Sequence, residues 1–130
     1  MTKFFYDSYA IIEFVNGNEK FRKYFLENDG ITTLYNAMEV YYSVLKEKGE
    51  AKANETLKLL APIVFYPTLE YVEDSMKFRL KHKEKKLSYA DCLGYAIALK
   101  LKIKFLTGDE DFRNVNNVEF LKAWTIFKVI

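Results

Sequence analysis

Two aspartates in this sequence stand just after short apolar runs, at positions where a site could form. Asp7 directly follows the run 4–6, and Asp109 lies three residues past the run 103–106. If the two runs are neighbouring parallel strands, both acids lie at the edge of the sheet where α/β proteins place their sites. Helix capping is the alternative for each acid, because Asp is a favoured N-cap residue. The sequence leaves both interpretations open.

Asp91 lies in a segment whose pattern indicates a buried helix. It is one of only three clearly polar residues in the segment 88–101, and a helix that is apolar on nearly every side is buried. On a helical wheel Asp91 shares its face with Gly94 and Ala98, whose small side chains allow another element to approach the acid. Ser88 and Asp91 also have capping-box spacing. We favour Ser88 alone as the cap, because capping does not require a helix buried all round.

Glu39 is the fourth acid, at the edge of an apolar stripe in an expected helix over 34–47. Spacing alone favours a solvated Glu, paired with Ser43 or Lys46, over a site residue. The four acids lie far apart in the sequence, so only folding can bring them together.

Four converging carboxylates would repel one another, and their burial without partners is expensive. Proton uptake or cations could neutralise them. Since the chain offers no cluster of His or Cys donors, the suitable ions are oxygen-ligated Mg²⁺ or Mn²⁺. Two such ions about 4 Å apart can hold the attacking water and the leaving oxygen of a phosphodiester. The reaction class that fits an acid-only site is therefore metal-assisted phosphoryl hydrolysis.

The elements that would position these acids alternate along the chain. Strands are expected over 4–6, 30–33, 63–66, 103–106 and, as a fifth, 118–121. Helices are expected over 10–15, 19–27, 34–47, 51–60, 69–82 and 88–101. This order predicts an α/β fold with a mainly parallel sheet, right-handed crossovers and helices on both faces.

The expected helix over 34–47 carries an apolar stripe with helical spacing. Its members are Leu34, Met38, Tyr41, Tyr42 and Leu45. We expect this stripe to face the core.

Length and composition bound the class of protein. The chain has 130 residues, half of them hydrophobic, which predicts one domain spanning 1–130 and excludes a disordered chain. With one cysteine, Cys92, and one histidine, His82, a disulfide framework and a zinc finger are excluded. Cys92 is expected to be a small buried hydrophobe and His82 a loop residue. No apolar run is long enough to span a membrane, so we expect a soluble protein of the reducing cytoplasm.

Four ordered pieces of the chain resemble a known family, the PIN-domain nucleases, and within them the VapC-like ribonuclease toxins of toxin–antitoxin pairs. The pieces are Phe4-Phe5-Tyr6-Asp7-Ser8, Asn36-Ala37-Met38-Glu39-Val40-Tyr41-Tyr42, Leu87-Ser88-Tyr89-Ala90-Asp91-Cys92 and Phe105-Leu106-Thr107-Gly108-Asp109-Glu110-Asp111-Phe112. Each piece is short, but the ordered set is fairly specific and covers nearly the whole chain. The chain departs from the family pattern after Asp7, where Ser8-Tyr9 replaces the usual small residue or Asn, so the local shape there can differ.

The resemblance implies a PIN-like three-layer α/β/α fold with a central sheet of four or five strands. It implies Mg²⁺ or Mn²⁺ dependence, endonucleolytic cleavage of RNA, a homodimer and a cognate antitoxin. The family's four acids map onto Asp7, Glu39, Asp91 and Asp109, its neighbouring hydroxyl residues onto Ser8 and Thr107, and an additional acid onto Asp111. Asp7, Asp91 and Asp109 would then ligate the metal, Glu39 would complete or tune the ligand set, and a water activated by the ion would attack phosphorus.

A basic run leads into the Asp91 helix. Its candidates for contact with the RNA backbone are Lys77, Arg79, Lys81, Lys83, Lys85 and Lys86. Lys and Arg contact phosphates without reading the base sequence. The alternative is a solvated helix end and loop.

Other interpretations compete with the nuclease. A haloacid-dehalogenase-like phosphatase needs a second Asp where Tyr9 stands, a phospho-receiver domain needs more acids beside the first strand, and a serine hydrolase lacks its nucleophile motif. Two hypotheses remain as alternatives: a PIN-fold module that binds RNA or protein without cleavage, and a PIN nuclease of RNA processing that has no antitoxin.

Overall fold

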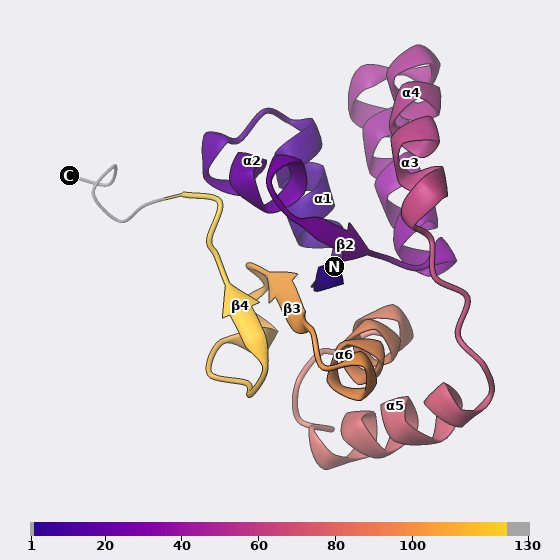
Figure 1. Cartoon of the computed structure of the whole chain (residues 1–130), viewed down its shortest axis with the longest axis vertical. Coiled ribbons are helices and arrows are strands. Elements are labelled where there is room, and N and C mark those ends of the chain that lie inside the picture. Colours follow the sequence, from indigo (N-terminus) through magenta and orange to yellow (C-terminus); the bar gives the residue numbers. More distant parts are fainter. Residues whose placement is uncertain (1, 125–130) are drawn as a thin grey trace.

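A parallel β-sheet forms the centre of the molecule in the computed structural model, which describes residues 2–124. Within that range the sheet has four strands: β1 (Thr2–Tyr6), β2 (Asp29–Ile31), β3 (Lys104–Thr107) and β4 (Val118–Phe120). Their order across the sheet is β2-β1-β3-β4 (Figure 1). All neighbouring pairs run parallel, so every strand brings its carboxyl end to the same edge.

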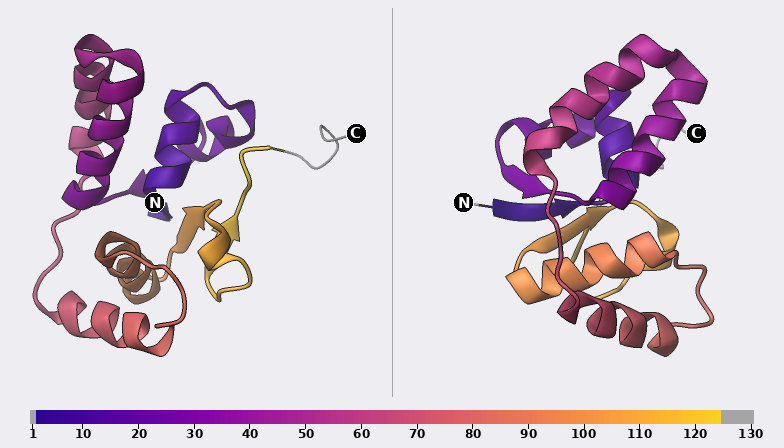
Figure 2. Two further views of the ribbon diagram at one scale, coloured as in Figure 1. Left: turned by 180° about the vertical axis from the view of Figure 1, so that it is seen from behind. Right: turned by 90° about the vertical axis from the view of Figure 1, so that its right-hand side faces the viewer.

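Helices cover both faces of this sheet. They are α1 (Ser8–Val15), α2 (Glu19–Leu26), α3 (Leu34–Lys48), α4 (Glu50–Leu60), α5 (Glu70–Lys81) and α6 (Tyr89–Leu101), with the 3₁₀ turns η1 (Ala61–Ile63) and η2 (Glu110–Phe112). α1 to α4 lie on one side of the strands and α5 and α6 on the other (Figure 2). The predicted three-layer α/β/α fold is confirmed.

The core consists of two apolar layers, one on each face of the sheet. Phe5 and Phe105, which stand opposite each other in β1 and β3, pack with α5 and α6. Tyr6 and Leu106, the next residues along, pack with α1 to α4. Successive side chains of a strand point to opposite faces, so each of the two inner strands contributes to both layers.

A glycine allows α6 to lie directly on the inner strands. A Cβ atom added to Gly94 would stand 2.5 Å from the ring of Phe5 and 3.1 Å from that of Phe105. Any side chain at Gly94 would therefore push α6 away from the sheet. This close packing fixes the start of α6, where Asp91 is located.

The strand predicted over 63–66 is wrong. The chain forms the 3₁₀ turn η1 there, and only Val64 makes a single parallel bridge, with Thr32. Pro62 lies inside the turn and Pro67 follows the segment. Pro62 favours the 3₁₀ turn that takes up Ile63, and Pro67 has no N–H with which a ladder could continue, so pairing is confined to the bridge at Val64.

The predicted orientation of α3 is also wrong. The buried side of α3 carries the smaller residues Asn36, Ala37, Val40 and Val44, and Tyr41 is half-buried. Four members of the predicted core stripe are exposed: Leu34 by 50%, Met38 by 61%, Tyr42 by 64% and Leu45 by 39%. Small residues allow α3 to pack closely against α1 and α4. The prediction failed because it assumed that the larger apolar side chains of α3 mark its buried side.

The length and hydropathy of the helices decide whether one of them could cross a membrane. None of those in residues 2–124 combines the length and the apolar character needed to cross a bilayer.

Cys92 is completely buried in α6, as predicted. Its burial, followed by the charge of Asp91, raises the pKa of its thiol to about 11. A thiol with so high a pKa is a poor nucleophile at neutral pH.

Candidate active site

Asp7 stands at the end of β1, next to the end of β3. Its backbone N–H donates to the carbonyl of Leu106 at 3.1 Å, and its side chain is only 3% exposed. Asp7 occupies the N-cap position of α1, yet its side chain makes no capping hydrogen bond. Instead, the Thr107 hydroxyl donates to Asp7 Oδ2 at 2.6 Å. The capping interpretation of the Asp7 side chain is therefore wrong.

Thr107 also holds Asp109 beside Asp7. The backbone N–H of Asp109 donates to Thr107 Oγ1 at 3.1 Å, so one hydroxyl contacts both predicted site residues. Asp109 Oδ1 accepts from the N–H of Asp111 at 2.9 Å and caps η2. A carboxylate has two oxygens with about four acceptor sites, so capping does not occupy the whole group.

Gly108, between these two residues, is closed in on both sides. A Cβ atom there would overlap the carbonyl oxygen of Leu121 and the ring of Tyr9. Lys122 Nζ donates to the Gly108 carbonyl at 3.0 Å and pairs with Glu110 at 3.1 Å. The segment that carries Asp109 is thus held from the C-terminal side of the chain.

Asp91 takes part in a complete capping box at the start of α6. The Asp91 N–H donates to Ser88 Oγ at 3.0 Å, and the Ser88 N–H donates to Asp91 Oδ2 at 2.9 Å. Ser88 is the cap, as predicted, but Asp91 completes the box, contrary to our preference for Ser88 alone. The box fixes the direction of the carboxylate, because one of its oxygens is tied to the backbone.

Glu39 is joined to the sheet edge by a chain of hydrogen bonds. Ser8 Oγ donates to Glu39 Oε1 at 2.6 Å, Asn36 Nδ2 donates to Ser8 Oγ at 2.9 Å, and Thr33 Oγ1 donates to Asn36 Oδ1 at 2.6 Å. Asn36 is almost completely buried. The sequence analysis gave Asn36 and Thr33 no site role. A polar residue three positions after a Thr N-cap, on the side of α3 that faces the sheet, was the available signal.

The charges of the four acids act on one another. Burial and, next, the charge of Asp91 raise the pKa of Asp7 to about 7; the Thr107 hydrogen bond lowers it, and Asp109 raises it. The pKa of Asp91 is raised by burial, against its hydrogen bonds with Ser88, and raised again by Asp109 and Glu39. The fold therefore gathers Asp7, Asp91, Asp109 and Glu39 within electrostatic range at the carboxyl edge of the sheet.

The donor chemistry of this edge fits a divalent cation, although the side chains do not form a closed metal cage. In residues 2–124, no three His, Cys, Asp or Glu side chains stand close enough together to hold a metal ion as they are arranged. The four acids offer only carboxylate oxygens, the ligands that Mg²⁺ and Mn²⁺ prefer. A bound cation would reduce the electrostatic repulsion between these carboxylates. A bound ion would require the carboxylates to close further on it.

The basic run divides into groups with different contacts. Lys77 pairs with Glu73 at 2.8 Å on the same helix, and Arg79 donates to the Leu87 carbonyl and lies over the ring of Tyr89. Lys85 Nζ donates to the Asp111 carbonyl at 3.0 Å. Lys81, Lys83 and Lys86 are exposed, as are Lys77 and Arg79, and Lys85 is half-buried. His82 packs against Phe78 at the end of α5.

We compared the sequence and the fold with those of known proteins. A family model described as "PIN domain" matches residues 4–118. The chain belongs to the PIN domain family. The predicted family resemblance is confirmed, and the match spans all four acids. Among curated proteins, none is a significant match to this sequence.

Solved structures share the fold of this PIN domain at low sequence identity. A toxin–antitoxin complex from Klebsiella pneumoniae matches with a TM-score of 0.72 at 18% identity, covering 94% of this chain and 98% of the other. VapC20 of Mycobacterium tuberculosis, a Sarcin-Ricin loop cleaving toxin, matches with a TM-score of 0.73 at 19% identity, covering 90% and 98%. FitAcB of Neisseria gonorrhoeae matches with a TM-score of 0.69 at 17% identity, covering 95% and 99%.

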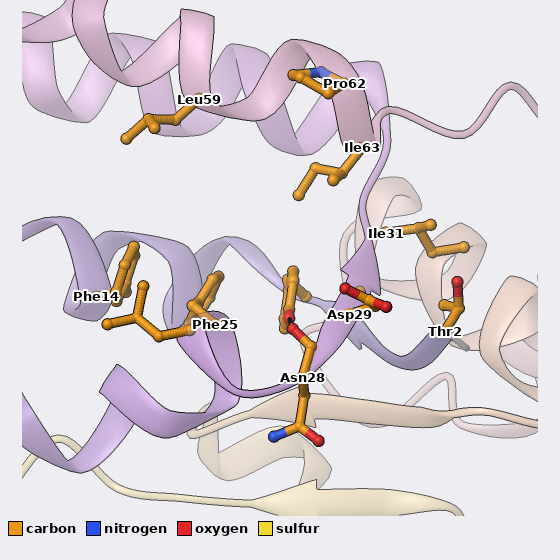
Figure 3. Close-up of a pocket in the computed structure, with 12 residues that line it drawn as sticks. Thr2, Phe14, Phe25, Asn28, Asp29, Ile31, Leu59, Pro62 and Ile63 are labelled. Atoms are coloured by element: carbon orange, nitrogen blue, oxygen red, sulfur yellow. Dashed lines mark hydrogen bonds between the residues drawn. The ribbon is translucent and has the colours of Figure 1, made fainter.

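A large cavity of this PIN domain lies apart from the acids. It measures about 540 Å³ and opens at the β2 side, between the α4–η1 segment and α1–α2. Leu59 and Ile63 form one wall, Phe14 and Phe25 the other, and Asp29 lines the cavity from the start of β2 (Figure 3). None of the four acids lines it, so this cavity is not part of the candidate active site.

Proposed function

We propose that this PIN domain is a divalent-metal-dependent endoribonuclease that hydrolyses RNA phosphodiester bonds. The observation that carries the proposal is the gathering of Asp7, Glu39, Asp91 and Asp109, each from a different part of the fold, where burial and the charges of neighbouring acids raise the pKa values of Asp7 and Asp91. Acids that interact in this way are typical of functional sites. RNA as the substrate is supported by the fold shared with VapC20, a Sarcin-Ricin loop cleaving toxin.

Asp7, Asp91 and Asp109 would hold Mg²⁺ or Mn²⁺, and Glu39 would complete or tune the ligand set. When bound, such an ion supplies an activated water and stabilises the charge that develops at phosphorus. The residues around the acids orient them. Thr107 fixes one oxygen of Asp7 and Ser88 one oxygen of Asp91.

The accessory residues hold the remaining acids. Ser8, itself held by Asn36, donates to Glu39, and the Asp111 N–H donates to Asp109. Each site carboxylate therefore has one orienting donor, which is the arrangement expected of ligands whose direction matters.

The proposal is tested by measuring cleavage of a labelled single-stranded RNA while Mn²⁺ or Mg²⁺ is titrated. Asp7→Asn is expected to lower the rate by about a thousandfold, because several kcal/mol of transition-state stabilisation depend on the ion. Mn²⁺ binding, measured by calorimetry, is expected to weaken with it. Asp74→Asn, an exposed acid on α5 that pairs with Lys100, is the matched control. Equal cleavage by wild type and Asp7→Asn, or full activity in excess EDTA, contradicts the proposal.

We further propose that the domain is a toxin held by a cognate antitoxin and that it forms a homodimer. The antitoxin is supported by the fold shared with toxin–antitoxin complexes from Klebsiella pneumoniae and nontypeable Haemophilus influenzae. A protein partner, whether antitoxin or second copy, is supported by the apolar side of α3, where Leu34, Met38 and Tyr42 are exposed. Exposed patches of this kind mark association surfaces. Purification together with the product of the adjacent gene tests the antitoxin.

A binding module that does not cleave is the second candidate. It is favoured by one observation: no three acids within residues 2–124 are placed to hold a metal as they stand. Wild type that retains RNA in Mn²⁺ without cutting it would support the module. Cleavage without any antitoxin gene nearby would instead support a PIN nuclease of RNA processing.

The compartment is proposed on chemical grounds. The single thiol, Cys92, is buried, and an RNA substrate belongs in a reducing cytoplasm. We treat the chain as one PIN domain over 1–130 acting there.

A further inference from the structure

A basic hollow lies beside the candidate active site. This cavity of about 620 Å³ is formed between the C-terminal end of α5 and the loop that follows η2. Lys81 and Lys85 line it from α5 and the turn after it, and Arg113 lines it from the loop. Phe78 and Tyr95 supply apolar surface, and none of the lining residues is acidic. A cavity with several cationic groups and no acid selects an anion.

Two hydrogen bonds connect this basic hollow to the acids. Lys85 Nζ donates to the Asp111 carbonyl at 3.0 Å, and the Asp111 N–H donates to Asp109 Oδ1 at 2.9 Å. A polymer that places one phosphate at Asp109 therefore has the hollow close by along its backbone.

The contacts of each basic side chain show which of them line the hollow. Of the predicted RNA-backbone residues, Lys81 and Lys85 line it, whereas Lys77 pairs with Glu73 and Arg79 lies over Tyr89. Arg113 was not predicted from the sequence as a phosphate contact.

Arg113, which lines the hollow, is held in a fixed direction. Its Nε and Nη2 each donate to the Glu110 carboxylate at 2.8 Å. These two bonds use part of a fork of five N–H donors. The remaining donors are available to an anion, and the ion pair with Glu110 limits the conformational entropy lost on binding.

We infer that the basic hollow binds a backbone phosphate of the RNA next to the scissile phosphodiester. The inference rests on the proposed endoribonuclease function and adds the place and the residues of a second phosphate contact. Lys81 and Lys85 supply the positive charge, and Arg113, whose charge is paired with Glu110, supplies N–H donors. Because a phosphate is the same for every nucleotide, the contact strengthens binding without selecting sequence.

Binding is measured with a fluorescent single-stranded RNA in EDTA, so that no metal-dependent cleavage interferes. The triple variant K81Q/K85Q/R113Q is expected to bind about tenfold more weakly at moderate salt. Its log–log salt slope should be smaller by about 0.7, since the hollow holds one phosphate and each phosphate contact on a single strand contributes about 0.7 to the slope. Single K81Q, at an exposed position, gives a smaller change in the same direction and guards against loss of the fold in the triple variant.

A charge-matched control separates the hollow from net charge. K46Q/K48Q/K58Q removes three exposed lysines from α3 and α4 and is expected to leave the affinity within twofold and the salt slope nearly unchanged. Equal loss in both triple variants, or no loss in the first, overturns the inference.

Cleavage assays with Mn²⁺ distinguish failure of the inference from failure of the proposed function. If the hollow variant cleaves with wild-type KM, the inference fails while the nuclease stands. If wild type binds RNA through the hollow but never cleaves it, the nuclease proposal fails and the hollow stands. If wild type binds no RNA in EDTA at any salt concentration tested, the inference is overturned.

Discussion

At the scale of single residues, the candidate site depends on short side chains that direct acids. Thr107 contacts both Asp7 and Asp109, and Ser8 contacts Glu39. These hydroxyls do not carry charge, so they set direction without neutralising the negative field. That field is what distinguishes this sheet edge from an ordinary surface with scattered acids.

Asp7 should make stability depend on pH. An acid whose pKa is higher in the folded protein keeps its proton after the unfolded chain has lost it, so the free energy of unfolding falls as pH rises between 3.8 and about 7 and is level above that. Asp7→Asn removes this titration. In EDTA at pH 8 the variant is expected to be more stable than wild type by about 4 kcal/mol, with a smaller difference at pH 5.

Urea unfolding at a series of pH values checks this prediction. Asp74→Asn, the same substitution at an exposed position on α5, should follow the wild-type profile. Parallel profiles for wild type and Asp7→Asn from pH 4 to 8 would show that Asp7 does not carry the shift. Added Mn²⁺ should stabilise wild type and leave Asp7→Asn unchanged.

Thr107 is expected to act through its hydroxyl rather than its volume. Thr107→Val keeps the shape of the side chain but removes the hydroxyl that donates to Asp7. Because this leaves a buried acceptor without its donor, the free energy of unfolding should fall by about 1–3 kcal/mol. Thr107→Ser keeps the donor and should retain most of both stability and cleavage. If Val and Ser variants lose stability and activity equally, packing of the methyl group, and not the hydrogen bond, explains the role of Thr107.

At the scale of elements, the sequence pattern located the strands that carry the site, but it did not predict every element or every residue of the site correctly. Asp7 and Asp109 could be placed because a parallel order fixes where strand ends meet. The segment 63–66 could not, since its β-branched residues indicate a strand, while the flanking Pro62 and Pro67 confine pairing to one bridge at Val64. The N-cap Thr33 was a local signal for Asn36, which lies three residues after it, but the hydrogen bond from Asn36 to Ser8 of α1 has no local signal in the sequence. Asn36 was missed because that contact is tertiary.

α6 illustrates how an element fixes a site residue. Gly94→Ala would place a methyl group 2.5 Å from the Phe5 ring, so α6 must move away from the sheet. We expect a loss of about 1–3 kcal/mol in the free energy of unfolding and weaker Mn²⁺ binding, because Asp91 moves with its helix. Leu99→Ala, on an exposed side of α6, is the control and should change stability by about 0.5 kcal/mol or less. A Gly94→Ala variant of wild-type stability would exclude the close packing.

At the scale of the whole molecule, distant parts of the chain converge on the segment 108–110. Lys122 contacts the Gly108 carbonyl and Glu110. Its own backbone carbonyl accepts from Lys20 Nζ at 2.6 Å, and the neighbouring Ala123 N–H donates to the Tyr9 hydroxyl. The start and the end of the described chain therefore both support Asp109, which explains how a small domain can hold an acid close to others of the same charge.

The apolar side of α3 is the largest departure from the sequence prediction, and it leads to a prediction about assembly. Met38 is 61% exposed, so Met38→Lys should leave the free energy of unfolding within about 0.5 kcal/mol of wild type. If α3 mediates the proposed homodimer, the same substitution should shift the protein to monomer, because a buried lysine without a partner opposes association.

Sedimentation equilibrium over a range of concentrations measures this effect of Met38→Lys. Leu59→Lys, at a position on α4 that is equally exposed at 61%, adds the same charge elsewhere and should retain the wild-type state. A dimer that survives Met38→Lys places the homodimer contact on another surface. A wild type that stays monomeric at all concentrations contradicts the homodimer itself and leaves the exposed side of α3 to a different protein partner, since an apolar surface of this kind is unfavourable in water.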